Sequence, residues 1–497
     1  MNYLSQEQFL NLSKQGNLIP VYKEILGDLE TPVSAYYKLA SKAKYSFLLE
    51  SVEGEEKIAR YSFIARDPEL ILTSKGQQAK ITRLVKGKLK EEKVSFKDSP
   101  LSIVRALMKD YRAVEIKALP RFYGGMVGYL SYDCVRFFER LPDQSKDDLK
   151  IPDVCLVLAK DLIVFDHRHH TIKVVSCVHL DQKDSQAQKI KKYQQALKVI
   201  EAMVKDLQKS TTPKSNKRSP KPLAVKSNHT KKQFERMVAV AQKHITAGDI
   251  IQVVLSQRFE VNIKVEALDV YRALRALNPS PYMFFLNFNG LHLVGASPEL
   301  LVRCENGLVE TRPIAGTRPR GMTDAADEAL KRDLLADPKE KAEHVMLVDL
   351  GRNDLGRVCK QGTVKLSEFM GVEKYSHVMH IVSNVQGQMR EDKDALDVLE
   401  AAFPAGTVSG APKIRAMEII EGLEGQKRGP YAGAVGYFSF SKNLDTCITI
   451  RTIVVRHGKA YVQAGAGIVA DSDPAKEYME TINKAKAQIK AIELAHT

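Results

Sequence analysis

The segment DPKEKAEHVMLVDL, residues 337–350, carries glutamates that could bind a metal ion. Asp337 is a good helix N-cap, Pro338 suits the first helical position, and Glu340 has the spacing of a capping box. Glu343 is in line with an apolar stripe, where a carboxylate is costly to bury unless it is paired or bound to a cation. A solvated glutamate at the edge of the stripe would explain the same spacing.

A second helix is predicted to begin after Asp473, and it also carries glutamates on one face. Glu477, Glu480 and Lys484 follow at the spacing i, i+3 and i+7, so they share that face. The simpler interpretation is a solvated ion pair between Glu480 and Lys484. The alternative is that Glu343 and Glu480 converge on one divalent cation. Oxygen ligands together with water and an anionic substrate would suit Mg²⁺.

A histidine in the segment YSHVMHIVSNVQG, residues 375–387, is the best candidate for a general base. The segment predicts a strand, in which His380 shares one face with Val378 and Val382. A lone histidine on an apolar face is usually a core residue with satisfied hydrogen bonds. If this face lines a cleft, the ring could accept a proton, because the histidine pKa lies near working pH.

Other residues have the chemistry of an anion site. The run TCITIRTIVV predicts a β-strand that contains Arg451, and a charged residue there needs an anionic partner such as a carboxylate. Gly465 and Gly467 would let backbone N–H groups approach an anion closely, although a bulge would explain one of them. The segment GTVSGAPK, residues 406–413, does not match a P-loop, but the helix N-terminus behind Ser409 could receive a carboxylate.

Apolar periodicity indicates the elements that must position these residues. A helix is predicted over residues 232–246 and a strand over 250–261, and several further strands look antiparallel. Because strands and helices mix without regular βαβ alternation, an α+β fold with large antiparallel β-sheets is expected. The cluster HRHH at 167–170 lies between two β-like runs, so it predicts a hairpin turn rather than a metal site.

The charge of the chain is concentrated in one stretch. Of the net charge of +15, a net +8 lies in residues 205–232, which contain nine Lys or Arg residues and one Asp. This stretch is rich in Ser, Thr, Asn and Pro and predicts a basic flexible linker between residues 1–204 and 233–497. Aromatic residues do not alternate with its basic residues, so nucleic-acid binding is not expected.

Composition also constrains the location of the protein. There is no long uncharged apolar run, so no membrane span is expected, and the N-terminus lacks the pattern of a signal peptide. The six cysteines are scattered and form no CxxC pair, which argues against a disulfide scaffold or structural zinc. A cytoplasmic protein is therefore expected.

These segments together resemble component I of anthranilate synthase, within the chorismate-utilising enzyme family. The matching motifs are GDIIQVVLSQRF, NPSPYMFF, VGASPE, RPIAGTRPRG, EHVMLVDLGRNDLGRV, YSHVMHIVSNVQG, FPAGTVSGAPKIRAMEIIE, GPYAGAVGYF and AGAGIVADSDPAKEYMETINKA. They cover nearly all of residues 230–490, and LLESVE and RYSFIA resemble the family's regulatory portion. The resemblance implies a sandwich-like core of antiparallel sheets with helices packed outside, a regulatory region at 1–204 and a chorismate-binding catalytic domain at 233–497.

The motif that contains Ala315 separates the reactions of this family. Aminodeoxychorismate synthases have a lysine there, which attacks the substrate ring, and isochorismate and salicylate synthases have a water-activating lysine where this chain has Gln252. Both lysines are absent here. The resemblance therefore implies an external ammonia nucleophile and an anthranilate product, at the first committed step of tryptophan biosynthesis, with aminodeoxychorismate synthase component I as the alternative. A non-catalytic regulatory or nucleic-acid-binding protein is the alternative from another class.

The resemblance also implies a role for each matching residue. Glu343 and Glu480 would hold Mg²⁺, with Glu340 and Glu477 nearby. Glu299 would protonate the leaving hydroxyl, His380 would remove the ring proton, and Thr407 would position the ring. The residues implied to bind chorismate are Gly316, Thr317, Tyr431, Arg451, Gly465, Ala466, Gly467 and Lys484.

Two further ligands are implied. Glutamine amidotransferases need a cysteine on a tight Gly-flanked turn, and none of the six cysteines here is Gly-flanked. A separate glutamine amidotransferase subunit is therefore implied to supply ammonia, in a heterotetramer of two large and two small subunits. Feedback inhibition by L-tryptophan is implied at Ser51, Pro281, Tyr282 and Met283.

Overall fold

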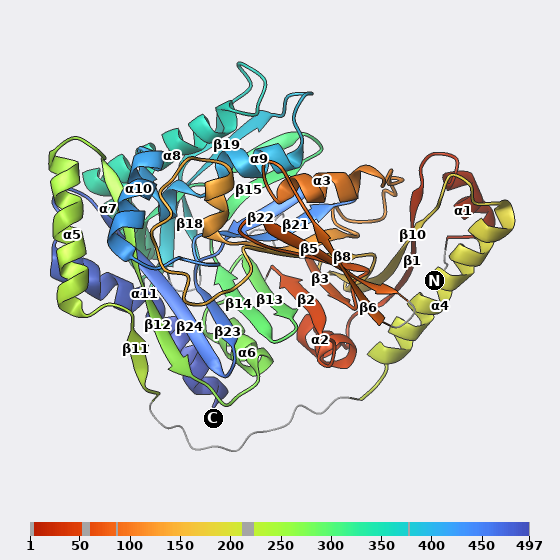
Figure 1. The fold of residues 1–497 in the computed structure, drawn as a ribbon. Helices are drawn as coiled ribbons and strands as arrows, with labels where there is room; N and C mark the ends of the chain where they lie inside the picture. The colour runs from red at the N-terminus through yellow and green to blue at the C-terminus, as the bar shows by residue number, and fades with distance from the viewer. Residues whose placement is uncertain (1–3, 52–59, 86–87, 211–222, 376–377, 497) are drawn as a thin grey trace.

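Two twelve-stranded sheets form the framework of the protein (Figure 1). The computed structural model describes residues 4–51, 60–85, 88–210, 223–375 and 378–496. The strands of sheet A, in spatial order, are β1 (Leu18–Leu26), β10 (Thr171–His179), β9 (Asp161–Asp166), β3 (Tyr61–Arg66), β2 (Tyr45–Glu50), β13 (Tyr282–Phe288), β14 (Leu291–Ser297), β23 (Thr452–Arg456), β24 (Lys459–Ile468), β12 (Gln252–Asn262) and β11 (Val225–Ser227), with β20 (Gly410–Ala411) beside β12. Those of sheet B are β17 (Ile314–Pro319), β19 (Val378–Gln388), β16 (Leu308–Thr311), β15 (Leu300–Glu305), β22 (Leu444–Ile448), β21 (Ala434–Ser439), β7 (Gly125–Leu130), β8 (Val154–Ala159), β4 (Leu70–Lys75), β5 (Gln78–Val85) and β6 (Lys88–Val94), with β18 (Lys365–Lys374) beside β19.

Helices lie outside the two sheets. They are α1 (Gln6–Leu12), α2 (Pro32–Ala40), α3 (Leu101–Lys109), α4 (Gln186–Leu207), α5 (Lys231–Thr246), α6 (Ala267–Leu277), α7 (Asp324–Ala336), α8 (Pro338–Gly356), α9 (Ala395–Ala402), α10 (Lys413–Glu424) and α11 (Pro474–Ala495), with short 3₁₀ turns η1 (Tyr132–Phe137) and η2 (Gly406–Val408). Figure 1 shows α1 and α4 at one end of the molecule, and α5, α7, α8, α10 and α11 grouped at the other. The predicted α+β fold with antiparallel sheets and outer helices is confirmed. No helix in the described ranges is both long and apolar enough to cross a membrane.

Many strands are apolar on both faces because each face is covered. In β2, Phe47 belongs to the core between the sheets, whereas Leu48 belongs to a second core beneath the helices. Phe284 and Phe285 divide in the same way in β13. Tyr271 of α6 is one of the helix residues that close the second core. Runs such as YSFLL therefore lack polar alternation because successive side chains enter different cores.

The N-terminal and C-terminal parts of the chain share both sheets. They meet at two seams, where β2 pairs with β13 in sheet A and β7 pairs with β21 in sheet B. The predicted boundary between residues 1–204 and 233–497 therefore separates two parts of the sequence, but each sheet contains strands from both parts. The regulatory role of the first range and the catalytic role of the second stay predictions.

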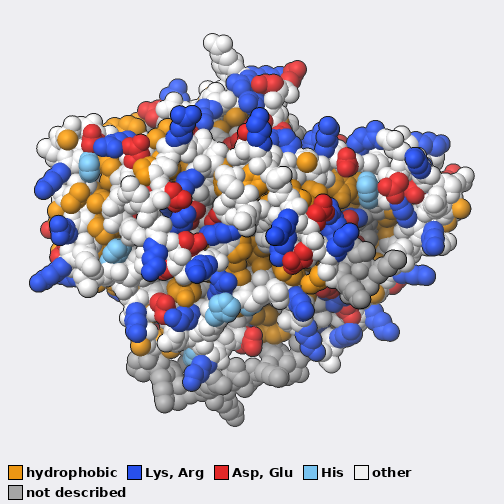
Figure 2. Space-filling model, viewed as in Figure 1, with side chains coloured by type: hydrophobic (Ala, Val, Ile, Leu, Met, Phe, Trp, Pro, Cys, Tyr) orange, Lys and Arg blue, Asp and Glu red, His pale blue; other side chains and the backbone are white. Residues whose placement is uncertain are grey.

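The predicted basic linker is only partly described. Its first residues, 205–207, end α4, residues 225–227 form β11, and residues 231–232 begin α5. Its middle, residues 211–222, lies outside the described residues. On the face shown in Figure 2, basic and acidic side chains are interspersed.

The histidine cluster at 167–170 forms a hairpin turn, as predicted. It connects β9 to β10, which pair through Asp166 and Thr171. The Asp166 carboxylate accepts a hydrogen bond from the His169 ring at 3.0 Å and forms an ion pair with Arg60. The cluster is therefore held by hydrogen bonds within the hairpin and by a neighbouring arginine.

Candidate active site

One cavity of about 650 Å³ gathers nearly all of the residues that the sequence singled out. It lies between β12 and β24 of sheet A, β17 and β19 of sheet B, and helices α8 and α11. The predicted residues that line it are Glu299, Gly316, Thr317, Glu340, Glu343, His380, Thr407, Tyr431, Arg451, Gly465, Gly467, Glu477, Glu480 and Lys484. Ala466 does not line it, because its side chain faces the buried apolar cluster of α5 and α10. The roles assigned to these residues stay predictions.

The stretch RPIAGTRPRG contains β17, and its arginines hold neighbouring elements in place. Arg318 bonds to Asp333 at 2.6 Å and to Asp337 at 2.9 Å, where α7 meets α8. Arg320 pairs with Asp327 at 2.6 Å, and Arg312 pairs with a carboxylate of β18. The arginines are thus occupied by internal carboxylates, and the cavity wall between them is formed by residues 314–317. Of these residues, Ala315 contributes only a methyl group to the wall.

The ring of His380 is fixed in one orientation. Its Nδ1 lies 2.9 Å from the Gly316 carbonyl oxygen and 3.1 Å from the Thr317 hydroxyl. Because a carbonyl only accepts, a neutral ring that donates from Nδ1 keeps its Nε2 lone pair free to take a proton. Burial lowers the pKa of His380 below its usual value, although the bond to Gly316 opposes that shift. The neutral form that a general base requires is therefore favoured.

Glu299 is a buried carboxylic acid at the wall of the same cavity. Burial raises its pKa to about 8, and Thr407 and Lys484 nearby offset part of the increase. Its backbone is held by β22, since the Ile448 N–H donates to the Glu299 carbonyl at 3.0 Å. A carboxyl group with this pKa keeps its proton at neutral pH and can donate it to a leaving group.

The prediction that Arg451 lies within a strand is wrong. β22 ends at Ile448 in sheet B and β23 begins at Thr452 in sheet A, so residues 449–451 cross between the sheets. Arg451 has a φ of +51°, as expected at a sharp change of direction. The alternating β-branched residues on either side of it gave no sign of the crossing.

This crossing leaves the Arg451 guanidinium available for an anion. Its Nη1 donates to the Lys484 carbonyl at 2.6 Å, and no carboxylate within the described ranges forms an ion pair with it. Burial lowers the pKa of Arg451, with Tyr431 and Glu480 opposing the shift. A buried guanidinium without a carboxylate partner is a good receptor for the carboxylate of a ligand.

Gly465 and Gly467 make room for two polar side chains. A Cβ at Gly465 would lie 2.7 Å from the Tyr431 hydroxyl, and a Cβ at Gly467 would lie 2.5 Å from the Gln252 amide nitrogen. Both contacts are shorter than real Cβ atoms tolerate. The close approach that the two glycines allow is thus to Tyr431 and Gln252, which line the cavity together with them.

Four glutamates on α8 and α11 give the cavity an excess of negative charge. Burial raises the pKa of Glu340, with Glu343 adding to the shift, and burial likewise raises the pKa of Glu477, with Glu480 adding to it. The Glu343 carboxylate accepts a bond from Gln252 at 3.3 Å. No three acidic, histidine or cysteine side chains in the described part of the chain are gathered closely enough to form a complete metal site.

The donor set nevertheless fits a hard divalent cation. All four candidates are carboxylates from two helices that face one cavity, and Mg²⁺ is typically bound by one or two carboxylates, water and substrate oxygens. An anion that entered this cavity would be repelled by these carboxylates unless a cation were present. The chemistry of these carboxylates therefore fits magnesium.

The capping role predicted for Glu340 is wrong. Asp337 caps α8 as expected, accepting from the N–H of Glu340 at 3.3 Å. The reciprocal bond does not form, because the Asp337 N–H donates to Asp333 at 3.1 Å. The Glu340 carboxylate lies 3.4 Å from Arg318 instead.

Sequence reasoning missed several residues of this cavity. Lys339 and Gln463 also line it, and Lys339 pairs with Asp471 at 3.7 Å. In the sequence, Arg318 stands out only as one arginine of a basic motif. In the structure it holds the junction between α7 and α8, close to Glu340.

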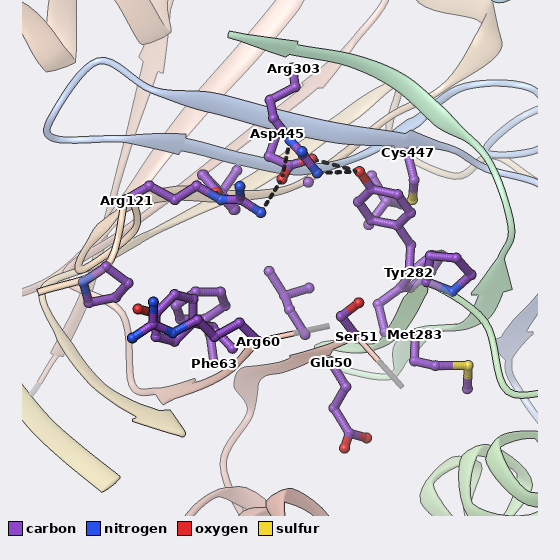
Figure 3. Close-up of a pocket in the computed structure, with 18 of the residues that line it drawn as sticks. Glu50, Ser51, Arg60, Phe63, Arg121, Tyr282, Met283, Arg303, Asp445 and Cys447 are labelled. Atoms are coloured by element: carbon purple, nitrogen blue, oxygen red, sulfur yellow. Dashed lines mark hydrogen bonds and ion pairs between the residues drawn. The ribbon is translucent and has the colours of Figure 1, made fainter. Parts of the chain in front are cut away.

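A second cavity, of about 680 Å³, contains the four residues predicted to bind an inhibitor. Ser51, Pro281, Tyr282 and Met283 all line it. In Figure 3 the Ser51 side chain points toward the space beside Tyr282 and Met283, whereas Glu50 points to the other side of the strand. The Ser51 hydroxyl is buried and has no hydrogen-bond partner among the described residues.

The polar end of this second cavity is a preformed network. The Tyr282 hydroxyl donates to Asp445 at 3.0 Å, and Arg303 and Arg121 bond to the same carboxylate at 3.0 and 3.1 Å (Figure 3). Burial raises the pKa of the Tyr282 hydroxyl above its usual value. The cavity thus combines an apolar side, an unpaired hydroxyl and fixed charges.

The second cavity lies between the two seams of the fold. Its walls include residues of β2 and β13, which form the seam of sheet A, and Val435–Tyr437 of β21, which belongs to the seam of sheet B. It shares no lining residue with the first cavity within the described ranges. A ligand bound there would contact both parts of the chain without touching the first cavity.

Comparisons with known proteins agree on one family. Residues 43–490 match the family model for chorismate binding enzyme. Anthranilate synthase component 1 from Acetivibrio thermocellus is 49% identical over 502 residues, which cover 100% of this chain and 99% of that protein. The crystal structure of anthranilate synthase component I from Streptococcus pneumoniae TIGR4 superposes with a TM-score of 0.76 at 37% identity, covering 94% of this chain and 99% of that one. The menaquinone-specific isochorismate synthase from Escherichia coli shares the fold, with a TM-score of 0.68 at 19% identity over 98% of each chain.

Proposed function

This chain belongs to the chorismate binding enzyme family, and from that premise we propose that it is the large subunit of an anthranilate synthase. It would convert chorismate and ammonia to anthranilate, pyruvate and water. The observation that carries the proposal is the cavity that combines Glu299, His380 and Arg451 with the unreactive Ala315.

We propose that ammonia, and no group of the chain, is the nucleophile. Ala315 offers a methyl group where an internal amine would have to stand, and Gln252 offers an amide. An amide is not a base at neutral pH, so it cannot activate water as a lysine amine would. The space beside Ala315 would accept ammonia, which adds to C2 of the ring as the C4 hydroxyl departs.

Two proton transfers are then assigned to residues of the cavity. Glu299, protonated at neutral pH, would donate its proton to the departing hydroxyl, which leaves as water. His380 would take the C2 proton at Nε2 while the enolpyruvyl C–O bond breaks, releasing pyruvate and leaving an aromatic ring. Arg451 would hold one substrate carboxylate at the crossing between the sheets.

We propose that Glu343 and Glu480 hold Mg²⁺, with Glu340 and Glu477 close enough to act through water. When bound, the ion would neutralise a ring carboxylate and so stabilise charge that develops during ammonia addition. The support is the donor set of the cavity and the anionic substrate that it must accept.

A separate glutamine amidotransferase subunit is proposed to supply the ammonia. All six cysteines are buried, and burial raises the pKa of each thiol. A glutaminase needs an accessible thiolate, so these cysteines do not provide one. We propose a heterotetramer of two large and two small subunits.

The purified chain with chorismate, Mg²⁺ and an ammonium salt at alkaline pH should form fluorescent anthranilate without any partner. Glutamine should replace ammonia only after a glutaminase subunit is added, and chelation of Mg²⁺ should abolish turnover. Formation of a non-fluorescent aminated product would favour aminodeoxychorismate synthase instead. Turnover with glutamine by the isolated chain would contradict the two-subunit proposal.

We further propose that L-tryptophan inhibits the enzyme by binding in the second cavity. Pro281, Tyr282 and Met283 are apolar and polarizable enough to enclose an indole ring, and the buried Ser51 hydroxyl could serve a polar group of the ligand. The position between the seams supports an allosteric effect. Tyr282 pairs with Ser297, two residues before Glu299, so a shift of β13 would reach the catalytic cavity through β14.

Ser51→Phe should relieve inhibition by tryptophan by at least about tenfold while uninhibited turnover stays close to wild type. The added ring would fill the space beside Met283, which removes binding but leaves the other cavity untouched. Chorismate turnover measured against tryptophan concentration in both proteins tests this. Unchanged inhibition in the variant would exclude this cavity as the inhibitor site.

A further inference from the structure

The ammonium group of Lys484 is bound to one of the proposed metal ligands. Its Nζ lies 2.6 Å from the Glu480 carboxylate and donates to the Gly465 carbonyl at 3.1 Å. Both residues line the catalytic cavity. A positive charge of the chain thus neutralises Glu480 at the place where an external cation is expected to bind.

Glu343 and Glu340, both on α8, have weaker internal partners. Gln252 donates to Glu343 at 3.3 Å, and Arg318 lies 3.4 Å from Glu340. Neither partner lies as close to its carboxylate as Lys484 does, and Gln252 carries no charge. Lys484 is therefore the main internal competitor for a cation at these glutamates.

The Lys484–Glu480 ion pair can be broken at little cost in stability. The two side chains are 39% and 46% exposed, and such half-exposed pairs contribute little to stability. When the pair opens, the Lys484 ammonium keeps its hydrogen bond to the Gly465 carbonyl, and the Lys484 backbone carbonyl still accepts a hydrogen bond from Arg451. A substrate carboxylate would then find the freed ammonium in the cavity that Arg451 also lines.

On the basis of the proposed function, we propose that Lys484 stands in for the cation in the metal-free protein. Binding of the cation and of the substrate would then open the pair together: the cation takes Glu480, and a substrate carboxylate takes Lys484. Each ligand would release the group that the other requires. By thermodynamic linkage the cation and the substrate would raise each other's affinity by the same factor.

The test is calorimetric titration of Mg²⁺ into the full chain in ammonia-free buffer, with and without saturating chorismate. Wild type should bind Mg²⁺ about 5-fold or more tightly when chorismate is present, at the lower end of typical coupling between sites. Lys484→Met should bind Mg²⁺ about 5-fold more tightly than wild type in the absence of chorismate. Chorismate should improve the affinity less than it does in wild type, because only the attraction between the ion and the ring carboxylate remains. Lys484→Arg, which keeps the charge, should behave as wild type does.

The matched control is Lys339→Met, which removes the same charge from the same cavity. Lys339 pairs with Asp471, and its charge also acts on Glu477, which is not one of the two glutamates proposed to hold the ion directly. Its loss should therefore change Mg²⁺ affinity less than the loss of Lys484 does, and it should leave the coupling near wild type. Equal tightening in both variants would show a general charge effect and overturn the inference. Unchanged Mg²⁺ affinity in Lys484→Met would overturn this inference but not the proposed metal site, provided that Glu480→Gln weakens Mg²⁺ binding. Failure of wild type to bind Mg²⁺ under either condition would overturn the proposed metal site and this inference with it.

Discussion

Glu299→Gln should lower the rate of anthranilate formation by about 100- to 10,000-fold, the usual contribution of a general acid. The amide has nearly the shape of the carboxyl group and can still donate a hydrogen bond, but it cannot transfer a proton. Chorismate binding should therefore change much less than turnover. With the concentration of unprotonated ammonia held constant, wild-type turnover should fall as pH rises above about 8, where Glu299 loses its proton.

The same substitution should change how stability depends on pH. The folded protein holds the Glu299 proton up to pH 8, whereas the unfolded chain loses it near the ordinary value of 4.5. Between these values the unfolded state binds fewer protons, so wild type loses stability as pH rises. Glutamine does not ionise, and the melting temperature of the variant relative to wild type should increase from pH 5 to pH 8.

Asp161→Asn is the matched control for this experiment. Burial also raises the pKa of Asp161, which lies in β9 and lines neither large cavity. It should show the same sign of pH-dependent stabilisation with full turnover. Near-normal turnover by Glu299→Gln would rule out its role as the acid, and a stability difference that is constant with pH would contradict its raised pKa.

His380→Ala should lower overall turnover by a similar factor, but it should act on the second chemical step. The ring is held by Gly316 so that Nε2 can take the C2 proton, and ammonia addition precedes that event. An aminated, non-aromatic intermediate should therefore accumulate. Rapid quench followed by chromatography of the products measures both steps separately.

His292→Ala serves as the control for loss of a buried histidine from a strand. His292 lies in β14, outside both large cavities, and should retain turnover in any variant that folds. Equal loss of both chemical steps in His380→Ala would indicate a structural role for the ring. Wild-type rates would exclude it as the base.

The residues of the catalytic cavity were easier to predict than their arrangement. Glu343 and Glu480 lie on helices whose N-caps are Asp337 and Asp473. Both helices could be predicted because N-caps and first-turn prolines are local signals. Recognition of the family from its motifs is confirmed by the comparisons. Nearly all of the predicted residues then proved to line one cavity.

The errors came from information that is not local. Arg451 was placed within a strand because β-branched residues flank it, but the chain crosses between sheets there, and periodicity does not reveal which sheet a strand joins. Glu340 was assigned to a capping box, and Arg318, which is distant in sequence, holds it instead. Local signals do not reveal the seam between β2 and β13, because the pairing of Glu50 with Met283 depends on the whole fold. Only the resemblance to the family places these two segments together, at the predicted inhibitor site.

The two seams also determine when the strands of each sheet can pair during synthesis on the ribosome. When the first 204 residues have emerged, β2 and β7 exist without β13 and β21, so each sheet ends in an open edge. Such edges are sites of wrong pairing between nascent chains. The seam of sheet A can form only after β13, which ends at Phe288, has been synthesised. The seam of sheet B can form only after β21, which ends at Ser439. The second cavity, whose walls come from both seams, consequently cannot form before Cys447 has been synthesised.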